Sequence, residues 1–243
     1  IPVSDLVIGM KCGGSDGLSG VTANPTVGAF SDMMIARGGS TVLTEVPEMF
    51  GAEGMLLSRC VSREVFDKAA SMLNGFKDYF ISHNETVYEN PSPGNKKGGI
   101  TTLEDKSCGC VQKGGTAPIV DVIGYGDTVT AHGLNMLYGP GNDLVSATAM
   151  TAAGAHIVLF TTGRGTPFGA PAPTIKIASN SQLAAKKSGW IDFDAGPVAE
   201  GEPIADAAKR LFDLVLQVAS GQLSKSEQLG YREIAIFKDG VTL

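Results

Sequence analysis

The feature that most constrains the fold is an alternation of two patterns along the chain. Short runs of apolar and β-branched residues, such as residues 119–123 and 174–178, are separated by longer segments in which apolar residues recur every three or four positions. The short runs are typical of strands and the longer segments of helices. Strands that alternate with helices usually pair in parallel, because the helix returns the chain to the same end of the sheet. The alternation predicts an α/β fold with a largely parallel sheet flanked by helices, a Rossmann-like layered architecture.

The boundaries of the expected elements follow from the same pattern. Strands are expected at residues 5–10, 41–46, 119–123, 156–160, 174–178 and 234–237. One helix is expected to begin at an Asn24 N-cap followed by Pro25, and another at a capping box of Thr101 and Glu104 that leads to Lys113. Apolar residues at helical spacing predict three more, at 62–81, at 142–153 and from Ile204 onward. Residues 90–99 hold two prolines and three glycines, so an irregular loop is expected there.

Length, charge and cysteine usage limit the number of domains and the class of partner. A chain of 243 residues is long enough for one sizeable core, and we expect a single domain over residues 1–243. A net charge of -6, without runs of Lys and Arg, argues against a nucleic-acid partner, and no apolar stretch is long enough to cross a membrane. The four cysteines form no evenly spaced disulfide framework, which favours reduced thiols in a cytoplasmic protein. A small molecule is the expected partner.

The first candidate binding motif is the glycine-rich loop KCGGSDGLSG, which begins at Lys11. It lies between an expected strand and an expected helix start, and parallel sheets bind ligands at the carboxyl ends of their strands. Backbone N–H groups of such a loop can bind an anion, for instance a carboxylate. The structural alternative is a tight turn in which Ser and Asp only satisfy backbone groups.

The second motif is the segment PGNKKGG, which begins at Pro93. Adjacent lysines usually mark a solvated surface, and that alternative stays open for Lys96 and Lys97. In a loop bounded by glycines, a Lys amine can also pair with a substrate carboxylate or, with a depressed pKa, accept a proton.

The third motif is TTGRGTP, which begins at Thr161 directly after an apolar strand. An Arg between glycines and hydroxyl groups at a strand end is well placed for bidentate binding of a carboxylate. A dinucleotide fingerprint fits poorly, because the glycines at 163, 165 and 169 lack the required spacing.

Signals for a metal centre are weak in this sequence. Cys108 and Cys110, with Cys12 as a third thiolate, are one conceivable ligand set for an iron–sulfur cluster. Residues two apart on a helix point in different directions, so we expect buried or partly buried thiols instead. Glu45 is a candidate site carboxylate, although a solvated strand end is the favoured interpretation.

Taken together, the three motifs resemble the C-terminal region of the D-altronate and D-galactarate dehydratases. The matching segments are KCGGSDGLSGVTANPTVG from Lys11, NPSPGNKKGGITTLEDKS from Asn90 and FTTGRGTP from Phe160. Two further segments, CVQKGGTAPIVDVIGYG from Cys110 and GYREIAIFKDGVTL from Gly230, are more similar to the altronate members than to the galactarate members.

The resemblance implies a hydro-lyase of hexuronate catabolism that converts D-altronate to 2-dehydro-3-deoxy-D-gluconate and water. It implies a divalent metal, Fe(II) or Mn(II), with unknown ligands. It also implies further N-terminal sequence of the same enzyme that this chain lacks, so residues 1–243 are expected to be the C-terminal catalytic domain of a longer dehydratase. A homo-oligomer is a possible assembly of that enzyme. The expected catalytic residues are Ser15, Asp16, Lys96 and Lys97, with Lys96 or Lys97 as base or cationic stabiliser and Asp16 as acid or metal ligand. The expected substrate-binding residues are Cys12, Ser19, Asn24, Asn95, Thr162 and Arg164.

Two other classes of function stay open from the sequence. One is galactarate dehydratase or a related lyase that expels another β-leaving group, such as sulfite. The other is a non-catalytic α/β module that binds an anion or a cofactor.

Overall fold

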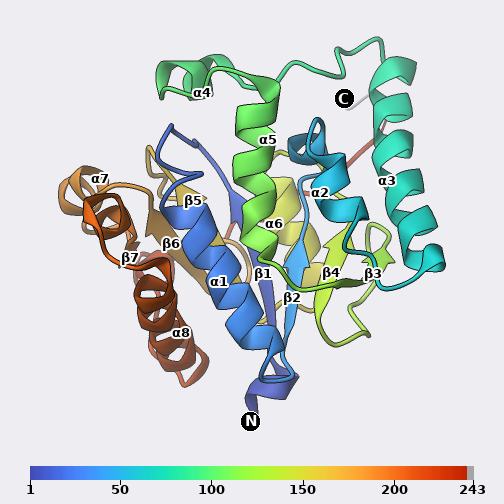
Figure 1. Cartoon of the computed structure of the whole chain (residues 1–243). Helices are drawn as coiled ribbons and strands as arrows, with labels where there is room; N and C mark the ends of the chain where they lie inside the picture. The colour runs from blue at the N-terminus through green and yellow to red at the C-terminus, as the bar shows by residue number, and fades with distance from the viewer. Residues whose placement is uncertain (240–243) are drawn as a thin grey trace.

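Seven parallel strands form one central sheet in the computed structural model, which describes residues 1–239 (Figure 1). The strands are β1 (Val7–Cys12), β2 (Ser40–Leu43), β3 (Ile119–Ile123), β4 (Leu134–Leu137), β5 (Ile157–Thr162), β6 (Thr174–Ala178) and β7 (Phe193–Asp194). Their order across the sheet is β3-β4-β2-β1-β5-β6-β7, and every pair of neighbours is parallel. The expected α/β fold with a parallel sheet is confirmed.

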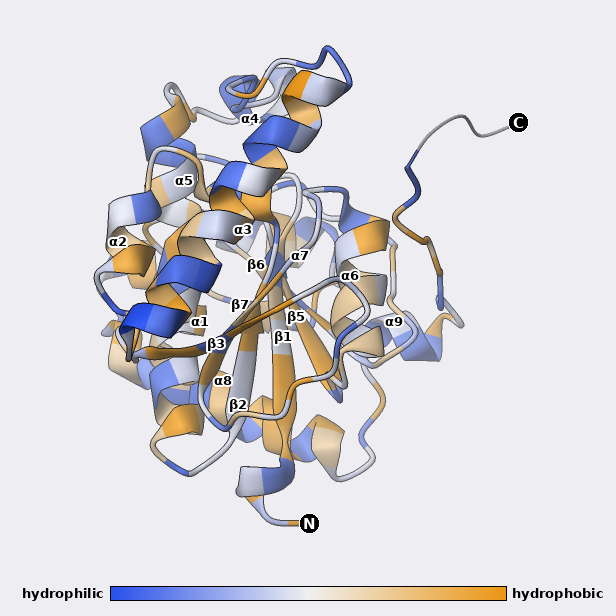
Figure 2. Cartoon of the chain, turned by 90° about the vertical axis from the view of Figure 1, so that its right-hand side faces the viewer, coloured by the Kyte–Doolittle hydropathy of each residue, from blue (hydrophilic) through white to orange (hydrophobic). Residues whose placement is uncertain are grey.

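Helices cover both faces of this sheet. They are α1 (Ala23–Ile35), α2 (Glu53–Leu57), α3 (Arg63–Ser82), α4 (Pro93–Lys97), α5 (Leu103–Val111), α6 (Asp143–Ala152), α7 (Ser181–Lys186), α8 (Ile204–Ala219) and α9 (Lys225–Gln228), with short 3-10 turns at η1 (Val3–Asp5), η2 (Val46–Met49), η3 (Gln112–Gly114) and η4 (Gly196–Glu200). Figures 1 and 2 show α1, α3, α5 and α8 on one face and α6 on the other. No helix among residues 1–239 combines the length and the apolar character needed to cross a membrane.

Two apolar cores hold the layers together. The larger one contains residues of α1, α3 and α8 packed on the face of the sheet that carries Ile8 and Met10 of β1. The smaller one contains Met150 of α6 packed on the opposite face, where Val158 and Phe160 of β5 lie. Because both faces are covered, β2, β4, β5 and β6 are buried at every position, which explains why apolar residues predominate in them on both faces.

The order of the strands reverses beside β1. The chain runs from β1 to β2 on one side, and later returns from β4 through α6 to β5 on the other side. Ligands in open parallel sheets bind outside the carboxyl ends of the strands at such a reversal. The first motif follows β1 and the third follows β5, so both lie at this point.

Most expected elements are confirmed, with shifts at their ends. α3, α6 and α8 agree closely with the sequence expectation, and Ser62 and Asn142 cap α3 and α6 as N-caps. The first strand begins two residues later than expected, because Val3–Asp5 forms a 3-10 turn. The strands β4 and β7 were not predicted, since both are short and their sequences lack a distinct β pattern.

Two expected helix starts and one expected loop need correction. Thr22, not Asn24, is the N-cap of α1, and the Asn24 side chain bonds to other parts of the chain. The cap of α5 is Thr102, whose hydroxyl accepts a hydrogen bond from the Asp105 N–H, one residue later than the expected box. Residues 90–99 are not wholly irregular, because Ser92 and Asn95 form a capping box that starts α4.

The expected strand at residues 234–237 is also wrong. This segment is extended but pairs with no strand among the described residues. Phe237 packs instead against aromatic rings of α3, with ring centroids 6.2 Å from Phe76 and 5.4 Å from Tyr79. Phe237 therefore takes part in packing against α3, whereas Ile234 and Ile236 are exposed.

Gly28 of α1 provides a test of the packing between α1 and η3. A Cβ at this position would lie 2.1 Å from the Gln112 carbonyl oxygen, so we expect Gly28→Ala to lower the free energy of unfolding by about 1–3 kcal/mol. Gly75 in α3 is the matched control, since its Cβ would meet no atom within 4 Å, and Gly75→Ala should raise stability by about 0.5–1 kcal/mol. Urea denaturation of both variants measures the difference, and equal shifts in the same direction would contradict the packing.

Candidate active site

The three sequence motifs meet at the carboxyl edge of the sheet. The Gly17 N–H donates to the Gly98 carbonyl at 2.8 Å, which joins the first motif to the second. The Gly163 N–H donates to the Gly14 carbonyl at 3.1 Å, which joins the third motif to the first. The expected convergence of these motifs, which are far apart in sequence, is confirmed.

Two glycines at this junction leave room for charged side chains of other motifs. A Cβ on Gly94 would lie 2.3 Å from a terminal nitrogen of the Arg164 guanidinium, so that group lies directly against the second motif. A Cβ on Gly163 would lie 2.2 Å from the carboxyl carbon of Asp16. Any side chain at either position would displace a charged group of the candidate site.

A cavity of about 960 Å³ opens beside this junction. Its wall takes residues from all three motifs, among them Asp16, Lys97 and Arg164. Lys186 and Lys187, at the end of α7, add two more cations. These four cations outnumber the two carboxylates on the wall, Asp16 and Glu200, so the cavity is attractive to an anion. The lysines of α7 were not predicted as site residues, because they lie outside the three motifs and resemble an ordinary surface pair.

Asp16 organises the first motif through its carboxylate. It accepts hydrogen bonds from the hydroxyls of Ser19 at 2.9 Å and Ser179 at 2.8 Å, and from the Asn180 side-chain amide at 3.1 Å. The Ser19 hydroxyl also accepts from the Asp16 N–H. These contacts tie the loop after β1 to the end of β6 and place the carboxylate on the cavity wall.

Four other predicted site residues are buried, and their described contacts are with protein groups. The Asn95 amide donates to the Ser15 carbonyl, and the Asn24 amide donates to the Gly109 carbonyl. The Thr162 hydroxyl accepts from the N–H groups of Arg164 and Gly165, which shapes the turn that presents the guanidinium. Ser15, Asn24 and Asn95 therefore hold the loops in place. Ser15 and Asn24 also border a cavity of about 150 Å³, and Thr162 borders another of about 260 Å³.

Hydrogen bonds within the protein limit the predicted role of the first loop, which was to bind an anion through its backbone N–H groups. The N–H groups of Gly13, Asp16 and Gly17 already donate to the Thr161 carbonyl, the Ser19 hydroxyl and the Gly98 carbonyl. Those three groups are not free for a ligand. Charged side chains, and not these amides, are the groups available to bind an anion.

The two lysines of the second motif differ in position. Lys96 and Lys97 are both exposed at the end of α4, and only Lys97 contributes to the wall of the large cavity. Arg164 is exposed as well, and among residues 1–239 its guanidinium forms no ion pair. Lys97 and Arg164 are thus the motif cations that a ligand in the cavity can reach.

A buried ionic cluster, which was not predicted from the sequence, lies beneath the loops. The Lys11 ammonium contacts Glu45 at 3.1 Å and Asp143 at 2.6 Å. The Lys113 ammonium contacts the second oxygen of Glu45 at 3.2 Å, and Lys106 forms an ion pair with Glu48 at 2.5 Å. The three lysines come from β1, α5 and η3, so these charges join the sheet to the helical layer.

Glu45 is the centre of this cluster, and its expected place at a solvated strand end is wrong. It is 1% exposed, and burial alone would raise its pKa, but the charges of Lys11 and Lys113 lower the pKa overall. Its backbone is left-handed, with φ 68° and ψ 58°, a costly conformation for Glu. The cost of this conformation is offset because both carboxylate oxygens contact buried ammonium groups. One oxygen contacts Lys11 on one side of the sheet, and the other contacts Lys113 on the opposite side.

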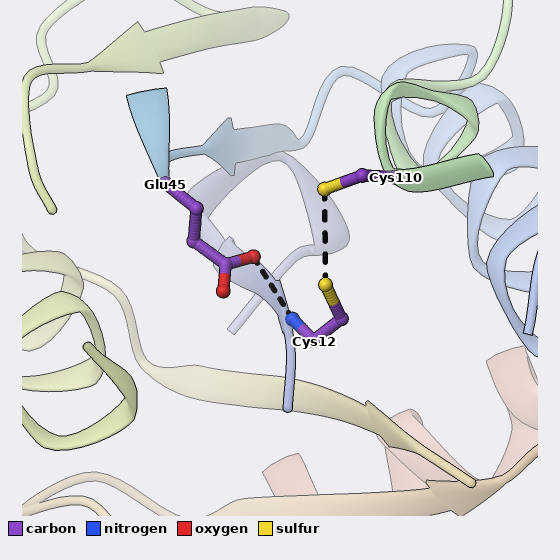
Figure 3. Close-up of side chains that lie close together, drawn as sticks. All are labelled: Cys12, Glu45 and Cys110. Carbon is purple, nitrogen blue, oxygen red and sulfur yellow. Dashed lines mark hydrogen bonds between the residues drawn. The ribbon is translucent and has the colours of Figure 1, made fainter. Parts of the chain in front are cut away.

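Cys12 and Cys110 form a close pair of free thiols beside Glu45 (Figure 3). Their sulfur atoms lie 3.7 Å apart, Lys113 lies 2.9 Å from the Cys110 sulfur, and the Cys12 N–H donates to Glu45 at 2.9 Å. A hydrogen bond from Cys110, aided by the charges of Lys106 and Lys113, lowers the pKa of Cys12 to about 6, whereas the same bond and burial raise the pKa of Cys110. Cys12 is thus favoured as the thiolate and Cys110 as the thiol.

The donor atoms of Cys12, Glu45 and Cys110 lie within 4.8 Å of one another, which invites a test as a divalent-metal site. Thiolate ligands suit Fe(II) better than Mn(II), but both sulfurs would have to lose their protons. Three ammonium groups already stand against three carboxylates and one thiolate in this cluster. The donor atoms are already engaged, because the Lys113 ammonium lies 2.9 Å from the Cys110 sulfur and the two Glu45 oxygens contact Lys11 and Lys113. A metal would have to displace these ammonium groups, so the cluster as it stands does not fit the expected metal.

Comparison with known proteins gives a consistent result. Residues 3–242 match the family model described as D-galactarate/Altronate dehydratase, C-terminal. The chain is 56% identical over 241 residues to the altronate dehydratase of Escherichia coli (strain K12), which covers 99% of this chain and 49% of that protein. It is 58% identical over 244 residues to the altronate dehydratase of Bacillus subtilis (strain 168), which covers 100% of this chain and 49% of that protein. It is 40% identical over 240 residues to the galactarate dehydratase (L-threo-forming) of Escherichia coli (strain K12), covering 97% of this chain and 46% of that protein. The chain spans about half the length of the curated relatives it matches.

The sulfur pair yields a prediction about pH. The ultraviolet absorbance of a thiolate should appear with a midpoint near pH 6 as the pH rises, since the pKa of Cys12 is lowered to about 6. Cys12→Ser should abolish this step, and Cys110→Ala should move it to higher pH because the hydrogen-bond donor to the thiolate is removed. Cys60→Ser is the control, because burial raises the pKa of Cys60. A wild-type curve without a step below pH 8, or one unchanged in Cys12→Ser, would refute the assignment.

Proposed function

Since the chain belongs to the D-galactarate and altronate dehydratase family, we propose that it is the C-terminal catalytic domain of a sugar-acid dehydratase. The proposed reaction removes water from D-altronate to give 2-dehydro-3-deoxy-D-gluconate. The higher identity to altronate dehydratases than to the galactarate enzyme supports this substrate. The cation-lined cavity at the junction of the three motifs is the observation that carries the proposal.

Arg164 is the proposed ligand of the substrate carboxylate. Its planar guanidinium can hold both oxygens of a carboxylate, and its contact with Gly94 restricts its orientation. The Thr162 hydroxyl fixes the turn from which the side chain projects. Lys97 and Lys187 are close enough to the same cavity to add positive charge around the bound acid.

The chemistry of dehydration explains the need for these cations. Removing the proton α to a carboxylate leaves an enediolate, in which negative charge gathers on the carboxylate oxygens. Fixed cations stabilise this charge more than they stabilise the ground state, and that difference lowers the barrier. Lys97 and Arg164 are proposed for this role, whereas Asp16 is proposed to position the loop.

A product assay with the full-length enzyme tests the proposed function directly. We expect D-altronate to give the 2-keto-3-deoxy acid in the presence of Fe(II) or Mn(II), with slower turnover of D-galactarate and other sugar acids. A preference for D-galactarate would move the substrate assignment to the other branch of the family. Lack of turnover with every sugar acid tested would refute the dehydratase proposal.

We predict that Arg164→Lys in the full-length enzyme lowers kcat/KM by about 100-fold, because a point charge does not orient a carboxylate as a planar fork does. Both kcat and KM should change, since misplacement of the substrate also slows proton removal. Arg37→Lys is the matched control, because Arg37 is exposed and follows α1 at the far edge of the sheet. Steady-state kinetics with D-altronate check the prediction, and values near wild type for Arg164→Lys would remove this residue from the site.

A further inference from the structure

A second, smaller cavity adjoins the large one at the reversal of strand order. It has a volume of about 260 Å³ and is bordered by Gly13, Gly14, Asp143, Thr162, Arg164 and Lys187. Arg164 and Lys187 also border the large cavity, so one bound molecule can contact groups in both. Asp143 is the one carboxylate among the described residues that borders the smaller cavity.

Asp143 connects this cavity to the buried ionic cluster. Its side chain is 37% exposed, whereas the side chain of Lys11, its ion-pair partner at 2.6 Å, is fully buried. The carboxyl group therefore has one side toward the cavity and the other toward a fixed cation. None of the three sequence motifs contains Asp143, and nothing in its local sequence marks it as a site residue.

The surrounding structure fixes the position of the Asp143 carboxyl group. Asp143 is the first residue of α6, and the side chain of the N-cap Asn142 accepts hydrogen bonds from the next two backbone N–H groups. Lys11 is itself fixed, because its ammonium also contacts Glu45 at 3.1 Å and the Ser146 hydroxyl at 3.2 Å. A Cβ on Gly13 would lie 2.5 Å from the free Asp143 oxygen, so this glycine leaves the approach open.

We propose that Asp143 is the catalytic base that removes the proton from C2 of the sugar acid while Arg164 holds its carboxylate. This inference rests on the proposed dehydratase function and adds a catalytic residue to it. The two groups lie on the wall of one small cavity, the geometry that a base and a carboxylate ligand need when the proton to be removed is on the adjacent carbon.

Electrostatics support Asp143 over Asp16 for this step. Burial raises the pKa of Asp143 despite the opposing charge of Lys11, and a carboxylate with a raised pKa is a stronger base than an ordinary Asp. The charged groups that face it are Lys11 from β1, Glu45 and Glu48 from η2 and its cap, and Arg164 and Lys187 across the cavity. The carboxylate of Asp16, in contrast, already accepts three side-chain hydrogen bonds.

The proposed step balances without any oxidant or reductant. The Asp143 carboxylate takes the C2 proton, and the electron pair of that C–H bond moves into the enediolate. This pair then forms the C2–C3 double bond as the C3–O bond breaks, and the departing hydroxide takes up one proton to leave as water. The resulting enol becomes the 2-keto-3-deoxy acid by moving its hydroxyl proton to C3, and Asp143 returns to the carboxylate when its proton leaves with the water or passes to solvent.

The test compares variants of the full-length enzyme with D-altronate under conditions in which the wild type turns over. We expect Asp143→Asn to lower kcat by about 100-fold or more while KM changes little, because a base contributes to the rate more than to binding. Asp67→Asn is the matched control, since Asp67 is also paired with a cation but is exposed on α3. In the wild type, kcat should rise with pH as the base loses its proton. This rise should be absent in Asp143→Asn.

A second variant separates a base from a residue that only supports the fold. In Asp143→Ala, added formate should restore part of the turnover, because a small carboxylate can enter the vacated space and accept the proton. Failure of formate to restore turnover, or a kcat of Asp143→Asn within tenfold of wild type, would overturn the assignment. A wild type that dehydrates no sugar acid would refute the proposed function itself, which is a different outcome.

Discussion

The burial of three lysine ammonium groups beneath the carboxyl edge of the sheet is the constraint on which the rest of the site depends. Moving one charged group out of water costs several kcal/mol, so each ammonium requires fixed anionic partners. Glu45 meets this requirement for Lys11 and Lys113 together, and to do so it adopts a left-handed backbone that costs about 1–3 kcal/mol. Losing one partner of such a buried pair typically destabilises a protein by about 3–5 kcal/mol. The cluster therefore fixes the strand ends that carry the loops.

This rigid base links the two parts of the candidate site. Lys11 and Cys12 are consecutive residues of β1, so their side chains point to opposite faces of the sheet. Lys11 fixes Asp143 of α6 on one face, and Cys12 meets Cys110 of α5 on the other. Directly after them comes the glycine-rich loop, which the third motif meets through the Gly163 to Gly14 hydrogen bond. Cavity, loops and ionic cluster are thus one connected structure built around the end of β1.

The sequence predicted the fold well because hydrophobic periodicity records which faces of an element are buried. The parallel sheet, α3, α6 and α8 all follow from that pattern, and the convergence of the motifs follows from the rule that parallel strands end at one edge. The ionic cluster could not be predicted in this way, since Lys113 and Glu45 become partners only through tertiary packing. Asp143 was missed for the same reason. The strand expected at 234–237 failed because Phe237 packs on α3 while Ile234 and Ile236 are exposed, so the apolar run does not record a place in the sheet.

The most direct test of this account is a crystal structure of the full-length enzyme with a 3-deoxy analogue of D-altronate, which lacks the leaving hydroxyl and cannot react. The account predicts the carboxylate of the analogue within hydrogen-bonding distance of the Arg164 guanidinium, with C2 facing the Asp143 carboxylate in the smaller cavity. The buried cluster of Lys11, Glu45 and Lys113 should be unchanged beneath it. An analogue bound at another site, with Arg164 and Asp143 both in contact with solvent, would contradict the central claim that the motif loops and the buried cluster form one active site.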